Sequence, residues 1–473
     1  MKKILFLALF FCTVNLHSQI FQSYNINLLS LSQPNLGDEG VDNRRYSGCW
    51  GWHQVSKNKE YGICGASNGT YFIDVSSPTT PTVSGFMPGA QKSTYREMKT
   101  YQHYCYIVSD DGQNKNFQIV DMQYLPDSIH VVYNDSTLFR RGHTIWIDKD
   151  KMYIGAMIQT LPLAITSMAV YSLANPESPV LLRKLDQDLP LLSYIHDMYV
   201  RNDTVFASAG SQGLYILKFD PIMNKFSQLG TYVDYQSHGY NHSSFLTKDG
   251  KHLIFCDEVP ERLPIHFVNV ENLSNIQPIK DWNPTGGNTT PHNPYIRDNF
   301  AIVSCYQDGL FIYDISQPSN INTVGYFDTH PQAGQNIGNY MNAPYRGNWG
   351  AYPFLPSGII IANDMQNGMF VLSAASAFTT TIKNPVGIKE NTAQESNLII
   401  YPNPASTQIA LHYTTQNPST LYLKNILGQV ITEKEFNGSL SEYLDVRSLE
   451  SGTYFISISE KGNIKTKKLI INH

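Results

Sequence analysis

The sequence is poor in charged residues, which make up 15% of the chain, whereas an average soluble domain has about 25%. Its 34 basic and 39 acidic side chains leave a net charge of −5. No run of Lys or Arg is long enough to form a nucleic-acid-binding surface. The composition therefore excludes a polyanion-binding protein, and we expect no nucleic-acid partner.

Long hydrophobic runs are also missing after the first residues. Lys2 and Lys3 precede a short apolar run at 4–11, and the small residue Ser18 follows at a suitable distance. This arrangement predicts a secretory signal peptide over residues 1–18. The run is too short for a transmembrane helix, and no later segment approaches 18 unbroken apolar residues. We therefore expect an exported protein without a transmembrane segment.

Cysteine is scarce, with six in the chain, one of them in the signal peptide. Cys49 and Cys64 flank a predicted turn at 57–59, so a cross-strand disulfide could join them in an oxidising compartment. The remaining three are expected to be small buried strand residues; they are Cys105, Cys256 and Cys305. The spacing of these cysteines does not match a metal-binding motif.

The motifs of several enzyme classes are absent. The sequence has no Gly-x-Ser-x-Gly elbow, no phosphate-binding loop and no His-Glu-x-x-His pair. Acidic pairs occur, but the sequence does not set the distance between their carboxyl groups, so a glycosidase remains an alternative. No reaction follows from a motif alone.

What the chain does have is turn-forming and β-favouring residues, with 32 Gly, 25 Pro and 30 Tyr. One apolar strand, often preceded by Gly and ended by Asp or Asn, recurs along the middle of the chain. Its central residues are spaced by 44 to 59 positions; they are Ile73, Ile119, Val170, Ile216, Val268, Ile312 and Val371. Periods of roughly 40–50 residues with several short strands each are typical of propeller blades.

A further strand precedes the recurring one in most units, an outer strand follows it, and an inner strand opens the next unit. We therefore predict an all-β fold with a seven-bladed β-propeller over residues 19–372. The seventh unit lacks an outer strand after Leu372, and the apolar segment 26–31 has no unit of its own. We expect this segment to close the ring as the outer strand of the seventh blade, which would remove an open sheet edge.

The recurring strand resembles a known family. The segment 309–318, which reads Gly-x-x-Ile-x-Asp-Ile-Ser-x-Pro, is similar to the secreted LVIVD-repeat propellers. Trp50-Gly51-Trp52 and the segments 345–358 and 368–372 resemble, more narrowly, the choice-of-anchor B group. The resemblance covers about residues 25–372, and it implies a propeller fold but no particular biochemical activity.

The pattern changes after a predicted linker at 373–396. Strands are expected at 398–401, 408–413, 420–425, 452–459 and 467–471, which predicts a small β-sandwich over residues 397–473. A set of short motifs runs through this segment; its members include Tyr401, Pro402, Asn403, Pro404, Gly428, Asp445, Gly452 and Tyr454.

These motifs resemble the C-terminal sorting domain of the type IX secretion system, an Ig-like sandwich. The resemblance implies the type IX machinery as a partner, export across the outer membrane, and an extracellular or surface-attached product. A carbohydrate-binding or merely stabilising sandwich is the alternative.

Histidine recurs where four predicted inner strands begin; the four are His143, His196, His242 and His292, with His53 as a further candidate. Inner strands line the central channel of a propeller. Loops expected at the same rim carry Asp110, Asp257, Glu258 and Asp364. Imidazole and carboxylate groups together suit a divalent metal or a polar ligand. Alternatively, each histidine caps its strand by bonding to the backbone of the next blade.

Aromatic residues leave a second choice open. Trp50, Trp52, Trp282 and Trp349 could form a rim that binds a glycan or a protein, or they could fill the spaces between blades. The sequence therefore predicts a secreted or cell-surface binding module of unknown ligand, with no cofactor certain. The alternative function is a metal-dependent hydrolase or lyase that uses the histidines and carboxylates at the channel mouth.

Overall fold

The computed structural model describes residues 21–379 and 398–473, apart from residues 39, 42, 91, 111–115, 162, 285–288, 332–345, 426–428 and 462. The predicted signal peptide and most of the predicted linker lie outside these residues. The chain divides into two units, residues Met1–Thr381 and Ile382–His473. Each is described by itself.

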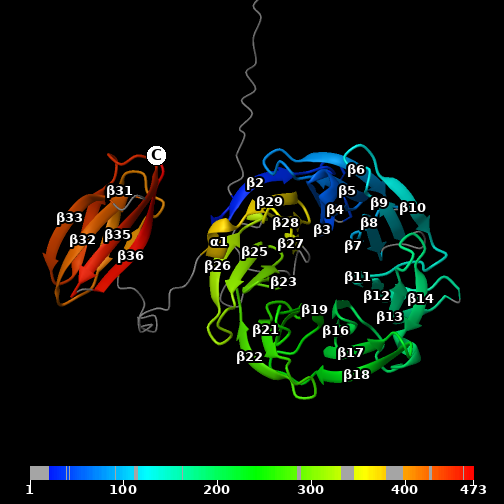
Figure 1. Cartoon of the computed structure of the whole chain (residues 1–473). Coiled ribbons are helices and arrows are strands. Elements are labelled where there is room, and N and C mark those ends of the chain that lie inside the picture. Colours follow the sequence, from blue (N-terminus) through cyan, green and yellow to red (C-terminus); the bar gives the residue numbers. More distant parts are fainter. Residues whose placement is uncertain are drawn as a thin grey trace, which may run out of the picture. The chain divides into compact units, whose positions relative to one another are not determined.

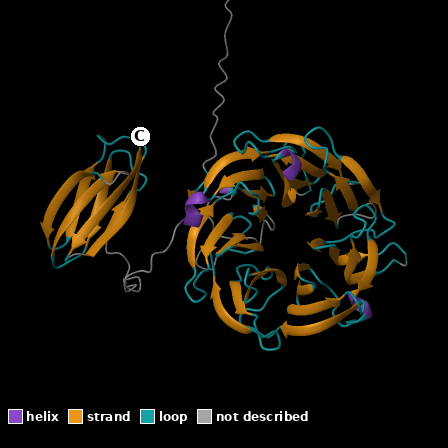
Figure 2. Cartoon of the chain, in the orientation of Figure 1, coloured by secondary structure: helices purple, strands orange, loops and turns teal. Residues whose placement is uncertain are grey.

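The first unit consists of seven antiparallel sheets arranged around a centre (Figures 1 and 2). We number them as blades in chain order. Blade 1 consists of β3 (Tyr46–Gln54), β4 (Lys59–Ala66), β5 (Gly69–Asp74) and β6 (Thr82–Pro88), and blade 2 of β7 (Arg96–Tyr101), β8 (Tyr104–Ser109), β9 (Phe117–Asp121) and β10 (His130–Asp135). Blade 3 consists of β11 (Thr144–Asp148), β12 (Lys151–Ile158), β13 (Ile165–Ser172) and β14 (Val180–Lys184). Blade 4 consists of β15 (Asp197–Arg201), β16 (Thr204–Ser208), β17 (Leu214–Asp220) and β18 (Lys225–Tyr232).

The remaining strands of this unit are β19 (Asn241–Leu246), β20 (His252–Asp257), β21 (Ile265–Asn269) and β22 (Gln277–Trp282) in blade 5; β23 (Asn293–Arg297), β24 (Phe300–Ser304), β25 (Leu310–Asp314) and β26 (Asn322–Phe327) in blade 6; and β27 (Asn348–Tyr352), β28 (Ile360–Asp364) and β29 (Gly368–Ser373) in blade 7. Short 3₁₀ turns occupy Val55–Lys57 and Leu185–Gln187, and the helix α1 spans Ala375–Thr379. The all-β propeller fold predicted from the repeat is confirmed.

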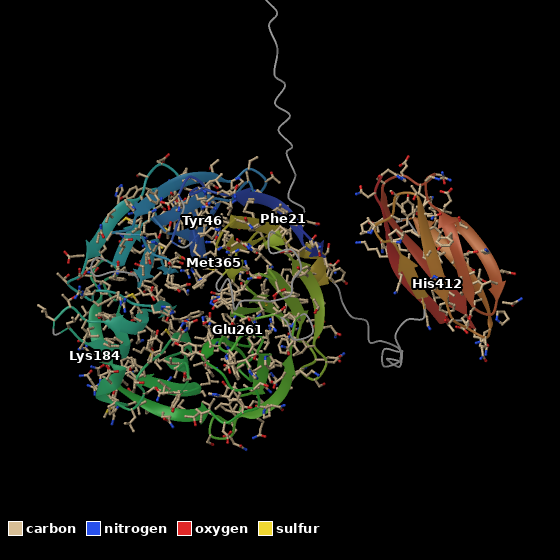
Figure 3. All side chains as sticks on the ribbon, turned by 180° about the vertical axis from the view of Figure 1, so that it is seen from behind. Phe21, Tyr46, Lys184, Glu261, Met365 and His412 are labelled. Carbon is tan, nitrogen blue, oxygen red and sulfur yellow. The ribbon has the colours of Figure 1, made fainter. Side chains whose placement is uncertain are left out.

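The N-terminal segment closes the ring. Strand β2 (Asn27–Ser32) pairs antiparallel with β29, with Leu31 opposite Phe370, and so becomes the outer strand of blade 7. This confirms the closure predicted for the segment 26–31. The segment also has a second attachment, which the sequence did not reveal. The two-residue strand β1 (Ser23–Tyr24) pairs with β26 and so extends blade 6. Phe21, labelled in Figure 3, packs against the rings of Phe327 and Phe370.

Helix α1 adds to the same region. Ala377 on this helix is fully buried in one core cluster with Ile26, Ile312 and Leu372. The guanidinium group of Arg297 lies 4.7 Å from the centre of the Phe378 ring. The packed core of the first unit therefore continues beyond Leu372, where the sequence analysis placed the last propeller residue.

The aspartate that ends the recurring strand has a structural reason. The carboxylate of Asp74 accepts a hydrogen bond from the backbone N–H of Ser76 at 2.9 Å, and Asp314 does the same with Ser316 at 2.9 Å. Such Asx turns reverse the chain without an unsatisfied backbone donor. Gly309 opens the strand with φ = +83°, and a Cβ atom there would lie 2.2 Å from the carbonyl oxygen of Phe327. Glycine is therefore required at that turn.

Cys49 and Cys64 lie directly opposite each other on β3 and β4. Both are free thiols, so the described structure does not contain the predicted disulfide. The Cys49 sulfur contacts the carbonyl oxygen of Gly350 at 3.4 Å, and the Asn363 amide donates to the Cys64 sulfur at 3.2 Å. The two sulfurs thus have separate partners at the junction with blade 7. The other three described cysteines are buried and free, as predicted for small strand residues.

The second unit is a sandwich of two antiparallel sheets. One sheet contains β30 (Leu398–Tyr401), β31 (Gln408–Tyr413) and β34 (Leu440–Asp445), and the other contains β33 (Val430–Asn437), β32 (Pro418–Asn425), β35 (Gly452–Glu460) and β36 (Asn463–Ile471). Buried residues such as Leu411, Leu423 and Ile458 form the core between the sheets. The sequence analysis did not find β33 and β34, because most of their residues are polar or exposed and form no apolar run.

Candidate functional site

The first strand of every blade lies at the centre of the ring (Figure 1). These seven inner strands contact one another in sequence, and β27 of blade 7 contacts β3 of blade 1, so the circle is complete. Because successive side chains of a strand point to opposite sides, alternate residues of each inner strand face the channel. Side chains from different blades are thereby brought to one axis.

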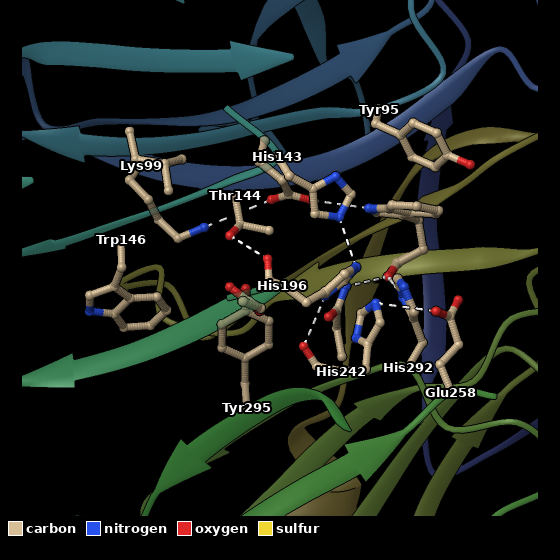
Figure 4. A pocket seen from close by; sticks show the side chains of 15 residues that line it. Tyr95, Lys99, His143, Thr144, Trp146, His196, His242, Glu258, His292 and Tyr295 are labelled. Atoms are coloured by element: carbon tan, nitrogen blue, oxygen red, sulfur yellow. Dashed lines mark hydrogen bonds and ion pairs between the residues drawn. The ribbon is translucent and has the colours of Figure 1, made fainter. Parts of the chain in front are cut away.

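The four predicted histidines meet at one mouth of this channel (Figure 4). His143, His196 and His292 stand just before the ladders of β11, β15 and β23. Their backbone N–H groups donate to the second strand of each blade, at the carbonyl oxygens of Gly155 (3.0 Å), Ser208 (2.8 Å) and Ser304 (2.8 Å) respectively. We call His143, His196, His242 and His292 the histidine row.

His242 reaches the row in a different way. The pairing of β19 with β20 shifts between Asn241 and Ser243, which leaves His242 as the extra residue of a bulge. A bulge redirects a side chain relative to the regular strand alternation. The same kind of shift, between Asn348 and Gly350, singles out Trp349 on β27. Both side chains line the cavity at the channel mouth.

The cavity has a volume of about 110 Å³. It is lined by residues of the inner strands, by residues that directly precede these strands, and by Glu258 after β20; they are Tyr95, Glu97, Lys99, His143, Thr144, Ile145, Trp146, His196, Asp197, His242, Glu258, His292, Asn293, Tyr295 and Trp349. Its walls therefore combine imidazole, carboxylate, ammonium and aromatic groups in one small space.

The imidazole rings of the row follow one another closely. Ring centres are 4.4 Å apart for His143 and His196, 4.3 Å for His196 and His242, and 4.2 Å for His242 and His292. The Nε2 atoms of His143 and His196 are 2.8 Å apart, so these two rings form a hydrogen-bonded pair.

Three of the rings are held through Nδ1. This atom contacts a carboxylate oxygen of Asp110 at 2.5 Å in His143, the carbonyl oxygen of His242 at 3.1 Å in His196, and the carbonyl oxygen of Trp349 at 2.6 Å in His292. A carbonyl oxygen only accepts, so Nδ1 of His196 and of His292 must donate. Nε2 of each neutral ring is then left with its lone pair.

Glu258 completes the cluster from the loop after β20. The hydroxyl of Tyr306 donates to one of its carboxylate oxygens, and the other lies 3.8 Å from Nε2 of His242. Two buried ring nitrogens nearby have no hydrogen-bond partner, namely Nδ1 of His242 and Nε2 of His292. Buried polar atoms are normally satisfied, so these two nitrogens are candidates for binding a ligand.

Burial sets the charge state of most of the row. It lowers the pKa of His196 and of His242 well below the usual value and that of His292 to about 3. Burial acts on His143 in the same direction, but the hydrogen bond and the charge of Asp110 outweigh it and raise the pKa. Burial also raises the pKa of Glu258, and it raises that of Asp197 to about 6. Three rings of the row are therefore neutral at pH 7.

Not every predicted carboxylate joins the site. Asp257 is fully buried, but it accepts hydrogen bonds from the Tyr235 hydroxyl (2.9 Å), the Gly239 N–H (2.7 Å) and the Asn241 amide (3.0 Å), and it is not part of the cavity wall. Asp364 similarly accepts from the Thr329 hydroxyl and from backbone N–H groups of its own turn. These two carboxylates hold loops together. His53 lies far along β3 and does not line the cavity.

Glu97 and Lys99 were not predicted as site residues from the sequence, yet both line the cavity, two residues apart on β7. Glu97 accepts a hydrogen bond from the Trp349 indole at 3.0 Å. The ammonium nitrogen of Lys99 lies 3.9 Å from Glu97 and 4.2 Å from the centre of the Trp50 ring. The sequence did contain an indication of this role, since two charged residues stand two positions apart in a strand at the centre of the ring. Charged side chains are rarely buried unless they are paired.

An aromatic layer lies below the charged residues. Six blades each contribute one ring; these are Trp50, Trp146, Tyr199, Phe245, Tyr295 and Tyr352. Blade 2 contributes Lys99 beside Trp50 and Trp146 instead. Trp349 lines the cavity, and Trp50 packs against Trp146 and Tyr295 of the cavity wall. Trp52 packs on Tyr61, and Trp282 packs on Tyr313. Of the two readings of the aromatic residues, the structure therefore favours packing over a glycan-binding rim.

One subset of the site could hold a metal ion. His242, Glu258 and His292 each offer a ligand atom, and these three atoms lie within 4.8 Å of one another. Imidazole nitrogen and carboxylate oxygen are ligands of divalent transition metals. The rest of the cavity would leave room beside such an ion for a few further atoms.

Comparison with known proteins identifies two parts of the chain. Residues 295–329 match the LVIVD repeat, and residues 399–472 match the secretion system C-terminal sorting domain. The protein is therefore a β-propeller with an LVIVD repeat that carries a type IX sorting domain at its C-terminal end. This domain indicates export across the outer membrane to the cell surface or the extracellular space. The narrower choice-of-anchor B grouping stays a prediction.

Individual relatives add little beyond this. An endo-acting ulvan lyase of Formosa agariphila is 32% identical over 87 residues, which are 18% of this chain and 17% of the lyase. A protein from Lactobacillus plantarum covers 85% of this chain and 99% of its own, with 11% identity and a TM-score of 0.47. A putative 6-phosphogluconolactonase from Bacteroides uniformis covers 85% and 100%, with 11% identity and a TM-score of 0.46.

The predicted sorting-domain residues lie mostly at turns and strand ends. The Asn403 side chain accepts from the Ile470 N–H and donates to the Lys468 carbonyl oxygen, both at 2.8 Å, which ties the first turn to β36. Asp445 forms an ion pair with Arg447 at 2.5 Å, and the Tyr454 hydroxyl donates to the Glu450 carbonyl oxygen at 2.9 Å. Pro402 and Pro404 belong to that first turn, Tyr401 ends β30 and Gly452 begins β35. Gly428 lies outside the described residues.

Among the described residues, no helix is long and apolar enough to cross a membrane.

Proposed function

We propose that this protein is an extracellular or surface-displayed binding module whose ligand site is the cavity at the channel mouth. The observation that carries the proposal is the pair of unpartnered, buried nitrogens of His242 and His292, in two residues that line a cavity of about 110 Å³. An unsatisfied buried polar atom costs about 1–3 kcal/mol, so a ligand that engages both atoms would stabilise the folded chain.

The size of the cavity limits the ligand. Drug-sized ligands occupy pockets of about 300–1,000 Å³, whereas this cavity offers about 110 Å³. An ion or a molecule of a few heavy atoms fits that space better than a glycan chain or a folded partner. The aromatic residues of the described channel support the same choice, because they pack against one another inside it.

A thermal-shift screen of divalent cations and small carboxylates tests the proposal. We expect at least one compound to raise the melting temperature of the wild-type chain and to have no effect on His292→Ala. His252→Ala is the matched control, because His252 is half-buried on β20 and does not line the cavity. Equal responses of the wild type and His292→Ala, or no response at all, would contradict a ligand site at the channel mouth.

A second candidate is a metal-dependent enzyme of the hydrolase or lyase class. It is favoured by the convergence of His242, Glu258 and His292, because two nitrogens and one oxygen leave coordination positions open for a substrate. Turnover of a small ester, lactone or uronic acid that disappears in His242→Ala and survives in His252→Ala would support it. Unchanged turnover in His242→Ala would exclude this site as its origin.

A further inference from the structure

The geometry points to a mononuclear centre for a divalent transition metal, with His242, His292 and Glu258 as its three protein ligands. This inference rests on the proposed function, since it identifies the ligand of the channel-mouth cavity. The three ligand atoms lie within 4.8 Å of one another, in three residues that are at most 8% exposed. No other group of His, Cys, Asp and Glu among the described residues offers three such atoms.

The orientation of His292 fits a metal ligand. Its Nδ1 donates to the Trp349 carbonyl oxygen at 2.6 Å, so the lone pair resides on Nε2, and that atom has no partner in the protein. Metal-binding histidines commonly donate the other ring N–H to a carbonyl or carboxylate oxygen, which fixes the tautomer. The hydrogen bond to the Trp349 carbonyl oxygen therefore fixes the tautomer of His292, as the corresponding hydrogen bond does for metal-binding histidines.

Glu258 is arranged in the same manner. The Tyr306 hydroxyl donates to one carboxylate oxygen and so fixes the orientation of the group. The second oxygen faces His242, 3.8 Å from its Nε2, and among the described residues no Lys or Arg forms an ion pair with this carboxylate. His242 also has an unpartnered Nδ1. A divalent cation at this point would engage all three groups at once.

His143 and His196 are not assigned as ligands. Their Nε2 atoms contact each other at 2.8 Å, so the lone pair of His196 already has a partner. Asp110 is engaged by Nδ1 of His143. The histidine row therefore divides into a hydrogen-bonded pair and a pair of potential ligands, although the sequence presents all four residues alike.

The ligand set also selects the kind of metal. Two of the three ligands are imidazole nitrogens, which suit Zn²⁺, Fe²⁺, Co²⁺ and Ni²⁺, whereas Mg²⁺ and Ca²⁺ prefer sets made of oxygen atoms. Three protein ligands leave at least one position vacant, and such open positions characterise reactive rather than structural metal sites. The other residues that line the same cavity include Tyr95, Tyr295 and Trp349.

The test uses the full chain, stripped of metal with a chelator and titrated with Zn²⁺ or Co²⁺. We expect one ion per chain by elemental analysis after gel filtration, and visible absorption of bound Co²⁺ with an intensity typical of fewer than six ligands. Mg²⁺ in tenfold excess should not compete. Glu258→Gln, which keeps the size of the side chain, should weaken Zn²⁺ binding by at least tenfold, and His292→Ala should abolish it.

Two other histidines provide matched controls. His266→Ala removes a buried histidine that contacts the carboxylates of Asp281 (3.0 Å) and Asp257 (4.0 Å) and does not line the cavity. His252→Ala removes the half-buried histidine of β20, which does not line the cavity either. Both should bind one ion with an affinity within about threefold of the wild type, and circular dichroism melting shows whether each variant is folded.

Three results would overturn the inference: no bound ion, binding that survives His292→Ala, or binding that His252→Ala abolishes. These results remain distinct from a failure of the proposed function. If the chain binds no transition metal but a small carboxylate still stabilises the wild type and not His292→Ala, the metal centre is refuted and the channel-mouth ligand site stands.

Discussion

His143 differs from the other histidines of the row because its Nδ1 meets the carboxylate of Asp110, whereas the rings of His196 and His292 donate to backbone carbonyl oxygens. Histidines at equivalent positions before their strands therefore have pKa values shifted in opposite directions. Proximity to a carboxylate favours the imidazolium form, and burial among neutral groups favours the neutral ring.

This difference predicts how stability depends on pH. The folded-state pKa of His292 is about 3, below the value of about 6.5 in an unfolded chain. The unfolded state therefore takes up the proton first, and stability falls as pH drops below about 6.5. For His143 the sign is opposite, because its raised pKa adds stability at low pH that is lost as pH rises through the folded-state value.

At pH 5 we expect His292 alone to remove about 2 kcal/mol of unfolding free energy relative to pH 7.5. Urea unfolding of the metal-free chain at both pH values measures the loss. His292→Asn lacks the titrating group, so its stability should fall by about 2 kcal/mol less than that of the wild type. Identical losses in the two proteins would show that His292 is not held neutral.

Lys99 gives a second prediction at the scale of the residue. Its ammonium group is buried, 3.9 Å from Glu97 and 4.2 Å from the Trp50 ring centre. Removing one member of a buried ion pair typically costs about 3–5 kcal/mol, because the other charge stays behind. Lys99→Met should therefore destabilise the chain strongly, and Lys99→Met combined with Glu97→Gln should recover part of the loss. Chemical denaturation of the two variants decides it, and equal stability of both would argue against a coupled pair.

At the scale of the element, the N-terminal segment is bound at two places. Strand β2 completes blade 7, and β1 extends blade 6. Without β2, the outer edge of β29 would expose unpaired N–H and C=O groups, which promote aggregation. The ring thus depends on a segment more than 300 residues away in sequence from the strand it pairs with.

Two truncations separate these attachments. A chain that begins after Tyr24 lacks β1 and the packed ring of Phe21 but keeps β2, and we expect a small decrease in its melting temperature. A chain that begins after Ser32 lacks β2 as well, and we expect a large decrease together with oligomers in light scattering. If the longer deletion melts at the temperature of the shorter one and stays monomeric, β2 does not hold the ring closed.

Much of this architecture could be predicted from the sequence because the blades repeat. The recurring strand and the closing segment 26–31 stand out through their apolar pattern. Strands β33 and β34 do not, since their residues are mostly polar and their pairing depends on neighbouring strands. The histidine row was visible because one residue type recurs at strand starts, but its division into two pairs was not.

Two further features of the site depend on three-dimensional detail. Between the adjacent residues Asp257 and Glu258, only Glu258 lines the cavity, because Asp257 is engaged by Tyr235, Gly239 and Asn241. The direction of the His242 side chain follows from a bulge, which no local pattern announces. The roles of Glu97 and Lys99 emerge only when seven blades meet at one axis.

At the scale of the whole molecule, the chain combines a closed ring with a sorting domain. The low content of charged residues agrees with this design, because seven packed sheets bury most of their faces. Deletion of residues 397–473 should leave the folded propeller in the periplasm, since the domain that directs export is gone. Cell fractionation with an antibody against the propeller measures this, with the full-length wild-type chain as the control that should be exported. Normal surface display of the truncated chain would contradict the assignment of the sorting domain.

The central claim is that the channel mouth binds a transition metal between His242, Glu258 and His292. Diffraction from crystals of the Co²⁺-loaded chain, recorded on both sides of the cobalt absorption edge, tests it most directly. We predict one anomalous peak per chain at about 2.0–2.2 Å from a nitrogen of each histidine and an oxygen of Glu258. A channel mouth without a peak, or a peak coordinated by other residues, would contradict the claim.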